Sequence, residues 1–181
     1  MKTESTVKFV LRLALTLLAI TAVVAVCLAG VNMITAPAIA ELNAQKTQEA
    51  IELVLPGGGE VVDFPETALV STVYASDSGY AVEVTPGGFD NTITMMVGID
   101  KSGSVLGISI ISHTETAGLG AVAAAGTPAG EAFRNEFVGA TGSVSVSKDG
   151  GDVEAITGAT ITSRAICVGV NAALEVVGKM G

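Results

Sequence analysis

The chain has 181 residues, of which 49% are hydrophobic and only 4% aromatic, and it carries a net charge of −9 at pH 7. This length predicts one domain with at most a small appendage, and the acidity argues against nucleic acid as a partner because it would repel phosphates. The charge is unevenly divided: residues 1–40 hold three basic residues and one acidic residue, a net charge of +2, whereas the remainder holds six basic and 17 acidic residues, a net charge of −11.

An uncharged run, residues 13–40 (LALTLLAITAVVAVCLAGVNMITAPAIA), dominates the N-terminal part. About 20 apolar residues suffice to cross the hydrocarbon core of a bilayer, so this run predicts a transmembrane helix. Basic residues precede it and acidic residues follow it, which places the N-terminus in the cytoplasm. We therefore expect a single-pass protein of the cytoplasmic membrane: residues 1–40 form a cytoplasmic stub and anchor, and residues 41–181 form one extracytoplasmic domain.

Two other readings of the anchor remain open. The letters AIA before Glu41 resemble a signal-peptide cleavage site, but the apolar region of a signal peptide usually spans about 7–15 residues, which favours a retained anchor. A lipoprotein attached through Cys27 is disfavoured because Val26 stands where a small residue is expected. Cys27 lies in the anchor and Cys167 in a C-terminal helical pattern, so we expect two buried small apolar side chains and no disulfide.

Beyond the anchor, the spacing of apolar residues predicts an α+β domain. Residues 41–55 have an apolar face at helical spacing, and Pro56 with three glycines ends this helix. Short apolar or alternating runs predict strands at 68–75, 79–84, 92–99, 105–111, 143–147 and 153–156. Further helices are predicted at 128–137 and at about 161–177. Because strands dominate the middle and turns join neighbours, we expect a mostly antiparallel sheet flanked by helices rather than a doubly wound sheet.

Two loops that follow predicted strands attract attention, SHTETAGLGAVAAAG and ITGATITS. Loops at strand ends often carry function. The chain has one histidine, His113, and it lacks a metal-spaced Cys/His cluster, a nucleophile elbow and a P-loop. We therefore predict no catalytic residue and no metal ligand, and we read His113 as a structural hydrogen-bonding residue rather than a catalyst.

The second loop leads into a predicted helix, and free backbone N–H groups at a helix start favour a phosphate. Hydroxyls at Thr160, Thr162 and Ser163 would add donors, and Arg164 would add charge. A plain helix cap is the alternative, because threonine is common at helix starts without any ligand.

Residues Glu154–Thr160, EAITGAT, resemble the flavinylation motif Asp-x-x-Ser/Thr-Gly-Ala-Thr of the Rnf G-subunit and Nqr C-subunit family. Residues His113–Gly120, HTETAGLG, resemble the His-x-Glu-Thr-Pro-Gly-Leu-Gly loop of that family, and Gly79–Asp100 is similar to its sheet segment. The chain departs from the family pattern at Glu154, where aspartate is usual, and at Ala117, where proline is usual. Neither departure removes the hydroxyl of Thr160, the last residue of the motif.

The resemblance implies a covalent cofactor, FMN, joined through a phosphoester to Thr160 by a separate flavin transferase that uses FAD as donor. It also implies that Thr157, Gly158 and Ala159 shape the turn at the attachment point. Four residues of the other loop would lie beside the ring or the phosphate: Glu115, Thr116, Gly118 and Leu119.

The resemblance further implies an electron-transfer subunit of an Rnf complex, which couples electron flow between reduced ferredoxin and NAD to ion movement across the membrane. Such a subunit would be part of a redox translocase without being catalytic alone, and its partners would be the other membrane subunits. Two alternatives are a C subunit of an Nqr-type NADH:quinone oxidoreductase, generally a longer protein, and a flavin-free membrane-anchored interaction module.

Overall fold

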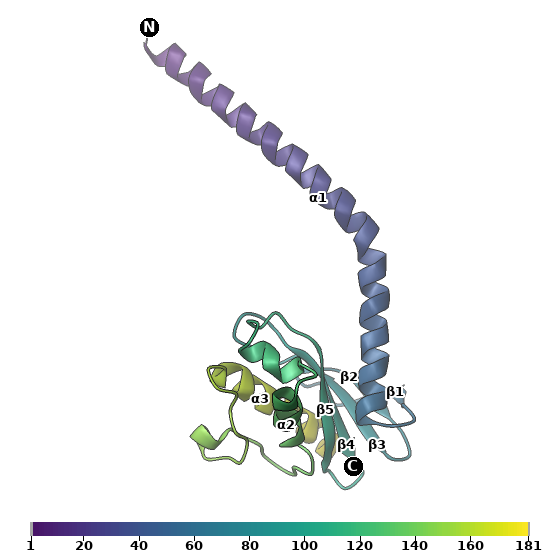
Figure 1. The fold of residues 1–181 in the computed structure, drawn as a ribbon. Coiled ribbons are helices and arrows are strands. Elements are labelled where there is room, and N and C mark those ends of the chain that lie inside the picture. The colour runs from purple at the N-terminus through teal and green to yellow at the C-terminus, as the bar shows by residue number, and fades with distance from the viewer. Residues whose placement is uncertain (1, 181) are drawn as a thin grey trace. The chain divides into compact units, whose positions relative to one another are not determined.

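The computed structural model describes residues 2–180. By its internal contacts the chain forms two units, one ending at Ala44 and the other beginning at Gln45. The elements follow one another as a long helix, five strands and a set of shorter helices (Figure 1). The fold is α+β, as expected.

The N-terminal unit consists of most of helix α1, which spans Lys2–Val54. The mean hydropathy of its most apolar stretch is 2.6, and none of that stretch is buried within the protein. The helix is therefore long and apolar enough to cross a bilayer. Helix α3, Thr160–Met180, also reaches the length and composition of a span. However, 61% of its most apolar stretch is buried in the protein, so α3 is a core helix of the second unit.

The second unit is built on a five-stranded sheet in which each strand pairs, antiparallel, with its neighbour in sequence. The strands are β1 (Glu60–Val62), β2 (Val70–Ala75), β3 (Gly79–Val84), β4 (Thr94–Asp100) and β5 (Val105–Ser112). This meander confirms the antiparallel hairpins expected from the alternating patterns.

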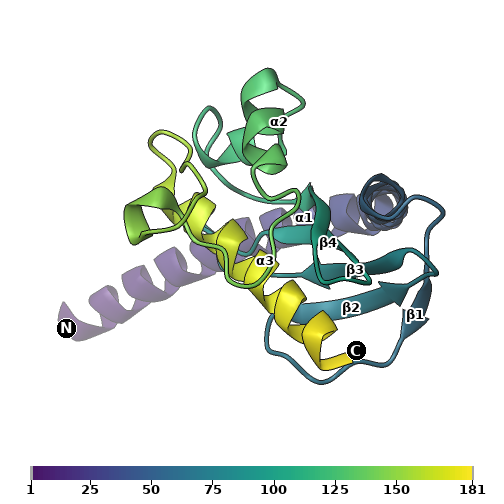
Figure 2. The same ribbon diagram turned by 90° about the horizontal axis from the view of Figure 1, so that it is seen from below.

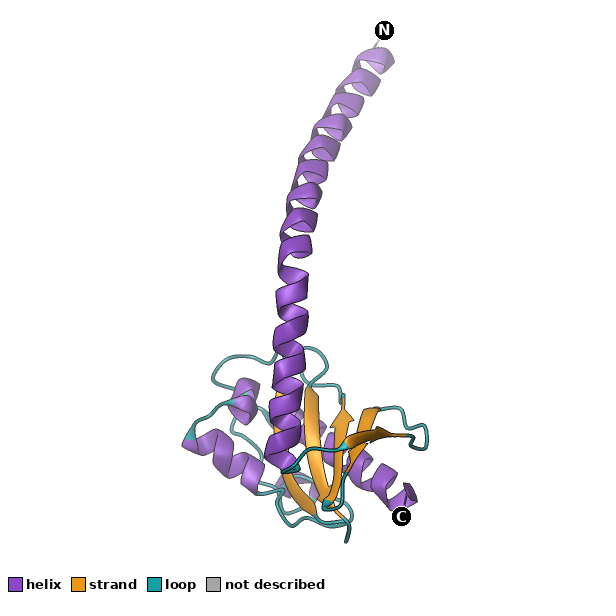
Figure 3. Ribbon diagram, turned by 90° about the vertical axis from the view of Figure 1, so that its right-hand side faces the viewer, coloured by secondary structure: helices purple, strands orange, loops and turns teal. Residues whose placement is uncertain are grey.

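The two faces of the sheet are covered by different helices (Figure 3). Because side chains alternate across a strand, Val82 and Val97 face the core shared with α3, whereas Ala81 and Met96 face the last turns of α1. The backbone of α1 approaches so closely that a Cβ at Gly98 would collide with the Val54 carbonyl.

The remaining helices lie between β5 and α3 in the chain: η1 (Gly120–Ala124), α2 (Pro128–Asn135) and η2 (Ser147–Asp149). Thr127 caps α2, since its hydroxyl accepts from the Gly130 N–H at 3.3 Å. Phe133 and the following Phe137 are buried with their rings edge to face, 5.4 Å between centroids. The aromatic face expected for residues 128–137 is therefore present, although the helix itself ends at Asn135.

Two of the predicted strands are wrong, and one strand of the structure was not predicted. Ser143–Ser147 and Val153–Ile156 are not strands; they meet only at one parallel bridge, between Val146 and Val153. The intervening residues fold into η2 instead of a hairpin turn. Strand β1 was missed because three residues are too few for an alternating pattern to be recognised.

Both cysteines are free, as expected. Cys167 is buried in α3, and burial raises the pKa of its thiol to about 11, so it packs as an apolar side chain. Cys27 lies on the surface of the apolar part of α1.

Candidate functional site

Thr160 is the first residue of helix α3, directly after the turn that contains Gly158. Gly158 has a positive φ of 78°, a conformation that favours glycine. The helical hydrogen bonds begin with the Ser163 N–H, which donates to the Ala159 carbonyl at 3.0 Å. The backbone N–H groups of residues 160–162 precede any helical acceptor, so they form the electropositive start of the helix.

Two of the hydroxyls near Thr160 are already engaged. The Ser163 hydroxyl donates to the Ala159 carbonyl at 3.0 Å and accepts from the Ile156 N–H at 3.1 Å. The Thr162 hydroxyl donates to Glu115 at 2.5 Å. Both residues are buried. They hold the turn together rather than offer donors to a ligand, contrary to the expectation from the sequence.

Glu115 joins three segments that are distant in the sequence. It is only 8% exposed. One carboxylate oxygen accepts from Thr162 on α3, and the other accepts from the Phe89 N–H at 2.8 Å. A Cβ at either Gly88 or Gly120 would collide with this carboxylate, so glycine at these positions allows the close approach.

The surface around Thr160 encloses a cavity of about 320 Å³. Three large apolar side chains on its lining are exposed: Phe89 at 66%, Leu119 at 42% and Ile161 at 51%. Exposed apolar side chains gathered in one place mark a binding surface. Thr160, half-buried, and Lys148, exposed, supply the polar groups on the same lining.

The short helix η2 lies beside the start of α3 in both Figure 1 and Figure 2. Lys148 of η2 donates from Nζ to the Thr160 hydroxyl oxygen at 3.1 Å. The next residue, Asp149, forms a two-point ion pair with Arg164, at 2.6 and 2.7 Å. Hydrogen bonding to Arg164 lowers the pKa of Asp149. Arg164 is thus held by a carboxylate instead of being the free cation that the sequence suggested.

Six of the eight residues singled out from the sequence line this one cavity: Glu115, Thr116, Leu119, Gly158, Ala159 and Thr160. The other two, Thr157 and Gly118, are exposed nearby in the chain and do not line it. Gly118 has a φ of 76°, so it shapes its loop. Phe89 and Lys148 also line the cavity and were missed from the sequence. Only Phe89 gave a local signal, as an aromatic residue inside a glycine- and aspartate-rich turn.

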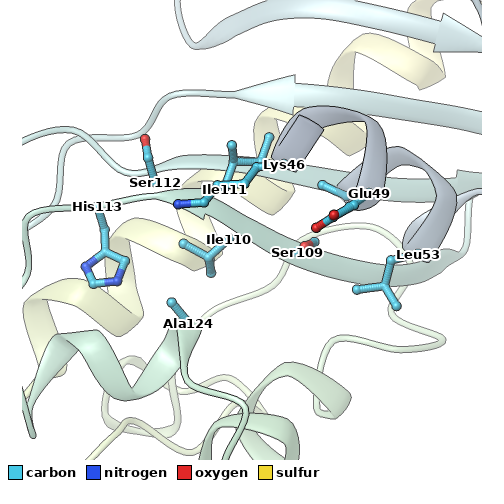
Figure 4. Close-up of a pocket in the computed structure, with 10 residues that line it drawn as sticks. Lys46, Glu49, Leu53, Ser109, Ile110, Ile111, Ser112, His113 and Ala124 are labelled. Carbon is cyan, nitrogen blue, oxygen red and sulfur yellow. The ribbon is translucent and has the colours of Figure 1, made fainter. Parts of the chain in front are cut away.

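A larger cavity, of about 620 Å³, lies elsewhere in the second unit. Figure 4 shows His113 and Ala124 on one side of it and Lys46 and Glu49 of α1 on the other, with β5 between them. The Nδ1 atom of His113 is buried and has no hydrogen-bond partner among the described residues. His113 does not line the cavity at Thr160, and the expected structural hydrogen bond is absent at this atom.

The comparison with family models places the chain in a class. Residues 88–175 match the family described as FMN-binding domain. This range contains the Thr160 cavity and the loop before it. The chain is therefore a protein with an FMN-binding domain, which follows a long apolar N-terminal helix in the sequence.

Curated relatives narrow the class. The chain is 33% identical to the G subunit of the Na(+)-translocating ferredoxin:NAD(+) oxidoreductase complex of Acetobacterium woodii, over 93% of this chain and 92% of the relative. It is 32% identical to the G subunit of the ion-translocating oxidoreductase complex of Methanosarcina acetivorans, over 94% and 95%. It is 30% identical to the G subunit of the proton-translocating ferredoxin:NAD(+) oxidoreductase complex of Clostridium ljungdahlii, over 83% and 82%. The chain belongs to this family of Rnf G subunits.

The residues at the cavity suit FMN on physical grounds. The apolar side chains of Phe89, Leu119 and Ile161 offer a surface for a flat aromatic ring. The start of α3 with Lys148 offers positive potential for a phosphate. A side chain at Gly158 would press against Leu119, so glycine keeps the passage between them open.

Proposed function

We propose that this chain carries FMN through a phosphoester at Thr160 and passes electrons within a membrane-bound, ion-translocating ferredoxin:NAD oxidoreductase. The observation that carries the proposal is the position of Thr160. Its hydroxyl lies at the start of α3, on the lining of a cavity with an exposed apolar rim, inside the range that matches the FMN-binding domain. The names of the full-length relatives support the wider function.

The flavin would supply one- and two-electron redox chemistry, and the protein would supply position and surroundings. The start of α3 would hold the phosphate, while Phe89, Leu119 and Ile161 would exclude water from the ring. Glu115 holds the α3 start against the Phe89 loop. Glu115, Thr116 and Leu119 would act from one side of the cavity and Gly158 and Ala159 from the other, while Gly118 and Thr157, which do not line it, would shape the two loops.

Two further parts of the proposal concern maturation and topology. A flavin transferase would attach the FMN from FAD to the exposed motif turn. Residues 1–40 would form the cytoplasmic stub and single membrane anchor, and residues 41–181 would lie outside the cytoplasm. The basic residues before the apolar part of α1 support this orientation.

The decisive test is the loss of covalent flavin in Thr160→Val, which keeps the shape of the side chain but removes the hydroxyl. The wild-type chain, produced with the transferase and denatured, should fluoresce as a flavoprotein in a gel, and Thr160→Val should not. Thr141→Val is the matched control, because Thr141 is an exposed threonine that does not line the cavity; it should stay fluorescent. Peptide mapping that locates the flavin on Thr157 or Thr162 would overturn the assignment, and a colourless wild type would favour a flavin-free module.

A further inference from the structure

We propose that Lys148 is the cation that holds the phosphoryl group at Thr160, and that helix η2 serves to place it there. This deepens the proposed function and rests on it, because it assumes that Thr160 is the acceptor. The direct observation is the 3.1 Å contact between Lys148 Nζ and the Thr160 hydroxyl oxygen.

The position of η2 is set by polar contacts to the segment around the acceptor. Each of its three residues makes one: Ser147 donates to Glu154 at 3.0 Å, Lys148 to Thr160, and Asp149 accepts from Arg164 at 2.6 and 2.7 Å. None of the three residues is buried. The flanking Val146 and Val153 are buried in the core and fix the ends of the segment, and the contacts to the motif and to the first turns of α3 direct η2 toward Thr160.

The charges around Thr160 leave a distinct role for Lys148. The guanidinium of Arg164 is neutralised by Asp149, and the carboxylate of Glu115 is occupied by Phe89 and Thr162. Lys148 donates to a neutral hydroxyl, that of Thr160. The chain has a net charge of −9 and therefore repels the anionic flavin donor, FAD. A cation beside Thr160 offsets this repulsion.

The proposed role of Lys148 follows from the reaction that attaches FMN to Thr160. Thr160 Oγ forms a bond to the phosphorus of the FMN half of FAD, the bond between the two phosphates breaks, and AMP leaves with the bonding electrons. The hydroxyl proton passes to a base of the transferase. Because Lys148 donates to Thr160 Oγ, the hydroxyl hydrogen points away from the ammonium group and remains available to that base. The ammonium group then pairs with the phosphoester oxygens in a charge-assisted hydrogen bond.

The experiment measures flavin loading of the full-length chain in detergent, with purified transferase and FAD, by intact mass over time. Lys148→Met should load about threefold more slowly than wild type, since it loses one charge-assisted hydrogen bond at an exposed site. Lys148→Arg keeps the charge and should restore most of the rate. Asp149→Asn, which weakens the contact to Arg164, should give a smaller loss. Lys101→Met is the matched control, an exposed lysine in the β4–β5 turn, and should load like wild type.

A second measurement separates a role in the bound state from a role in folding. The gain in melting temperature on complete loading should be smaller in Lys148→Met than in wild type, while the unloaded proteins melt alike. Wild-type rate and wild-type gain in Lys148→Met would overturn the proposal and leave Thr160 as the acceptor. If the wild-type chain never gains the mass of FMN, the proposed function itself is wrong.

Discussion

The carboxylate of Glu115 shows how one side chain defines the site. Its two oxygens accept from the Phe89 N–H and the Thr162 hydroxyl, so it connects the loop before β4 to the first turn of α3. A buried carboxylate with a donor on each oxygen has little freedom to turn toward a ligand. Glu115 therefore acts on the proposed flavin mainly through the segments that it holds in place.

Glu115→Gln should lower the free energy of unfolding by about 1–3 kcal/mol, because the amide NH₂ would face one of the two donors and leave it unsatisfied. Chemical denaturation of the full chain in detergent measures the change. Glu66→Gln is the control, as Glu66 is exposed in a loop, and it should stay within about 0.5 kcal/mol of wild type. Equal stability of Glu115→Gln and wild type would mean that the carboxylate does not clamp these segments.

At the scale of elements, the sheet was predictable and the segment around η2 was not. Alternating or continuous apolar runs located β2 to β5 because each pairs with a neighbour close in sequence. The same alternation occurs in Ser143–Ser147 and Val153–Ile156, which have no strand partner beyond one bridge. Whether an alternating run becomes a strand depends on a free edge to pair with, and local sequence does not reveal such an edge.

The candidate site was also only partly predictable from the sequence. The motif turn and the Glu115–Leu119 loop were found by resemblance, and their meeting at one cavity then followed from the fold. Lys148 reaches that cavity from a segment with no recognised motif, and Phe89 reaches it from the segment similar to the family's sheet segment, in which no site residue was predicted. The contact between Lys148 and Thr160 lies beside the ion pair of Asp149 with Arg164, and pairing across 15 residues cannot be read from spacing alone.

The packing of α1 on the sheet gives a prediction at this scale. Gly98→Ala should destabilise the domain by about 1–3 kcal/mol, because the new Cβ would collide with the Val54 carbonyl and force the backbone of α1 to shift. Gly107 is the control: it pairs with Gly98 across β4 and β5, yet a Cβ there meets nothing within 4 Å. Thermal unfolding of both variants measures the difference. A loss in Gly107→Ala as large as in Gly98→Ala would show that strand flexibility, not the contact with α1, is responsible.

At the scale of the whole molecule, the chain combines a lipid-compatible helix with an acidic folded domain. The three cations Lys2, Lys8 and Arg12 belong to the N-terminal 40 residues, and the excess of acidic residues belongs to the rest. Under the positive-inside rule the basic residues before the apolar stretch support the proposed orientation, with the N-terminus in the cytoplasm.

Protease added to sealed, right-side-out vesicles should therefore digest residues 41–181 and leave the anchor. The fragments can be followed with tags at each end of the chain, and a cytoplasmic protein enclosed in the vesicles controls for leakage. Inside-out vesicles should give the opposite result. Full protection of the domain in right-side-out vesicles would reverse the proposed topology.

The strand order also determines when the acceptor site comes into being. A meander forms from local pairings, which fold quickly. The site also needs a distant contact: Glu115 and Thr162 meet across 47 residues, and α3 is made after every other described element. The shape of the site around Thr160 is complete only once α3 has docked, because Thr162 on α3 then meets Glu115. A transferase that recognises this shape would modify mature chains and pass over incomplete ones, so the bound flavin would also serve as a record of successful folding.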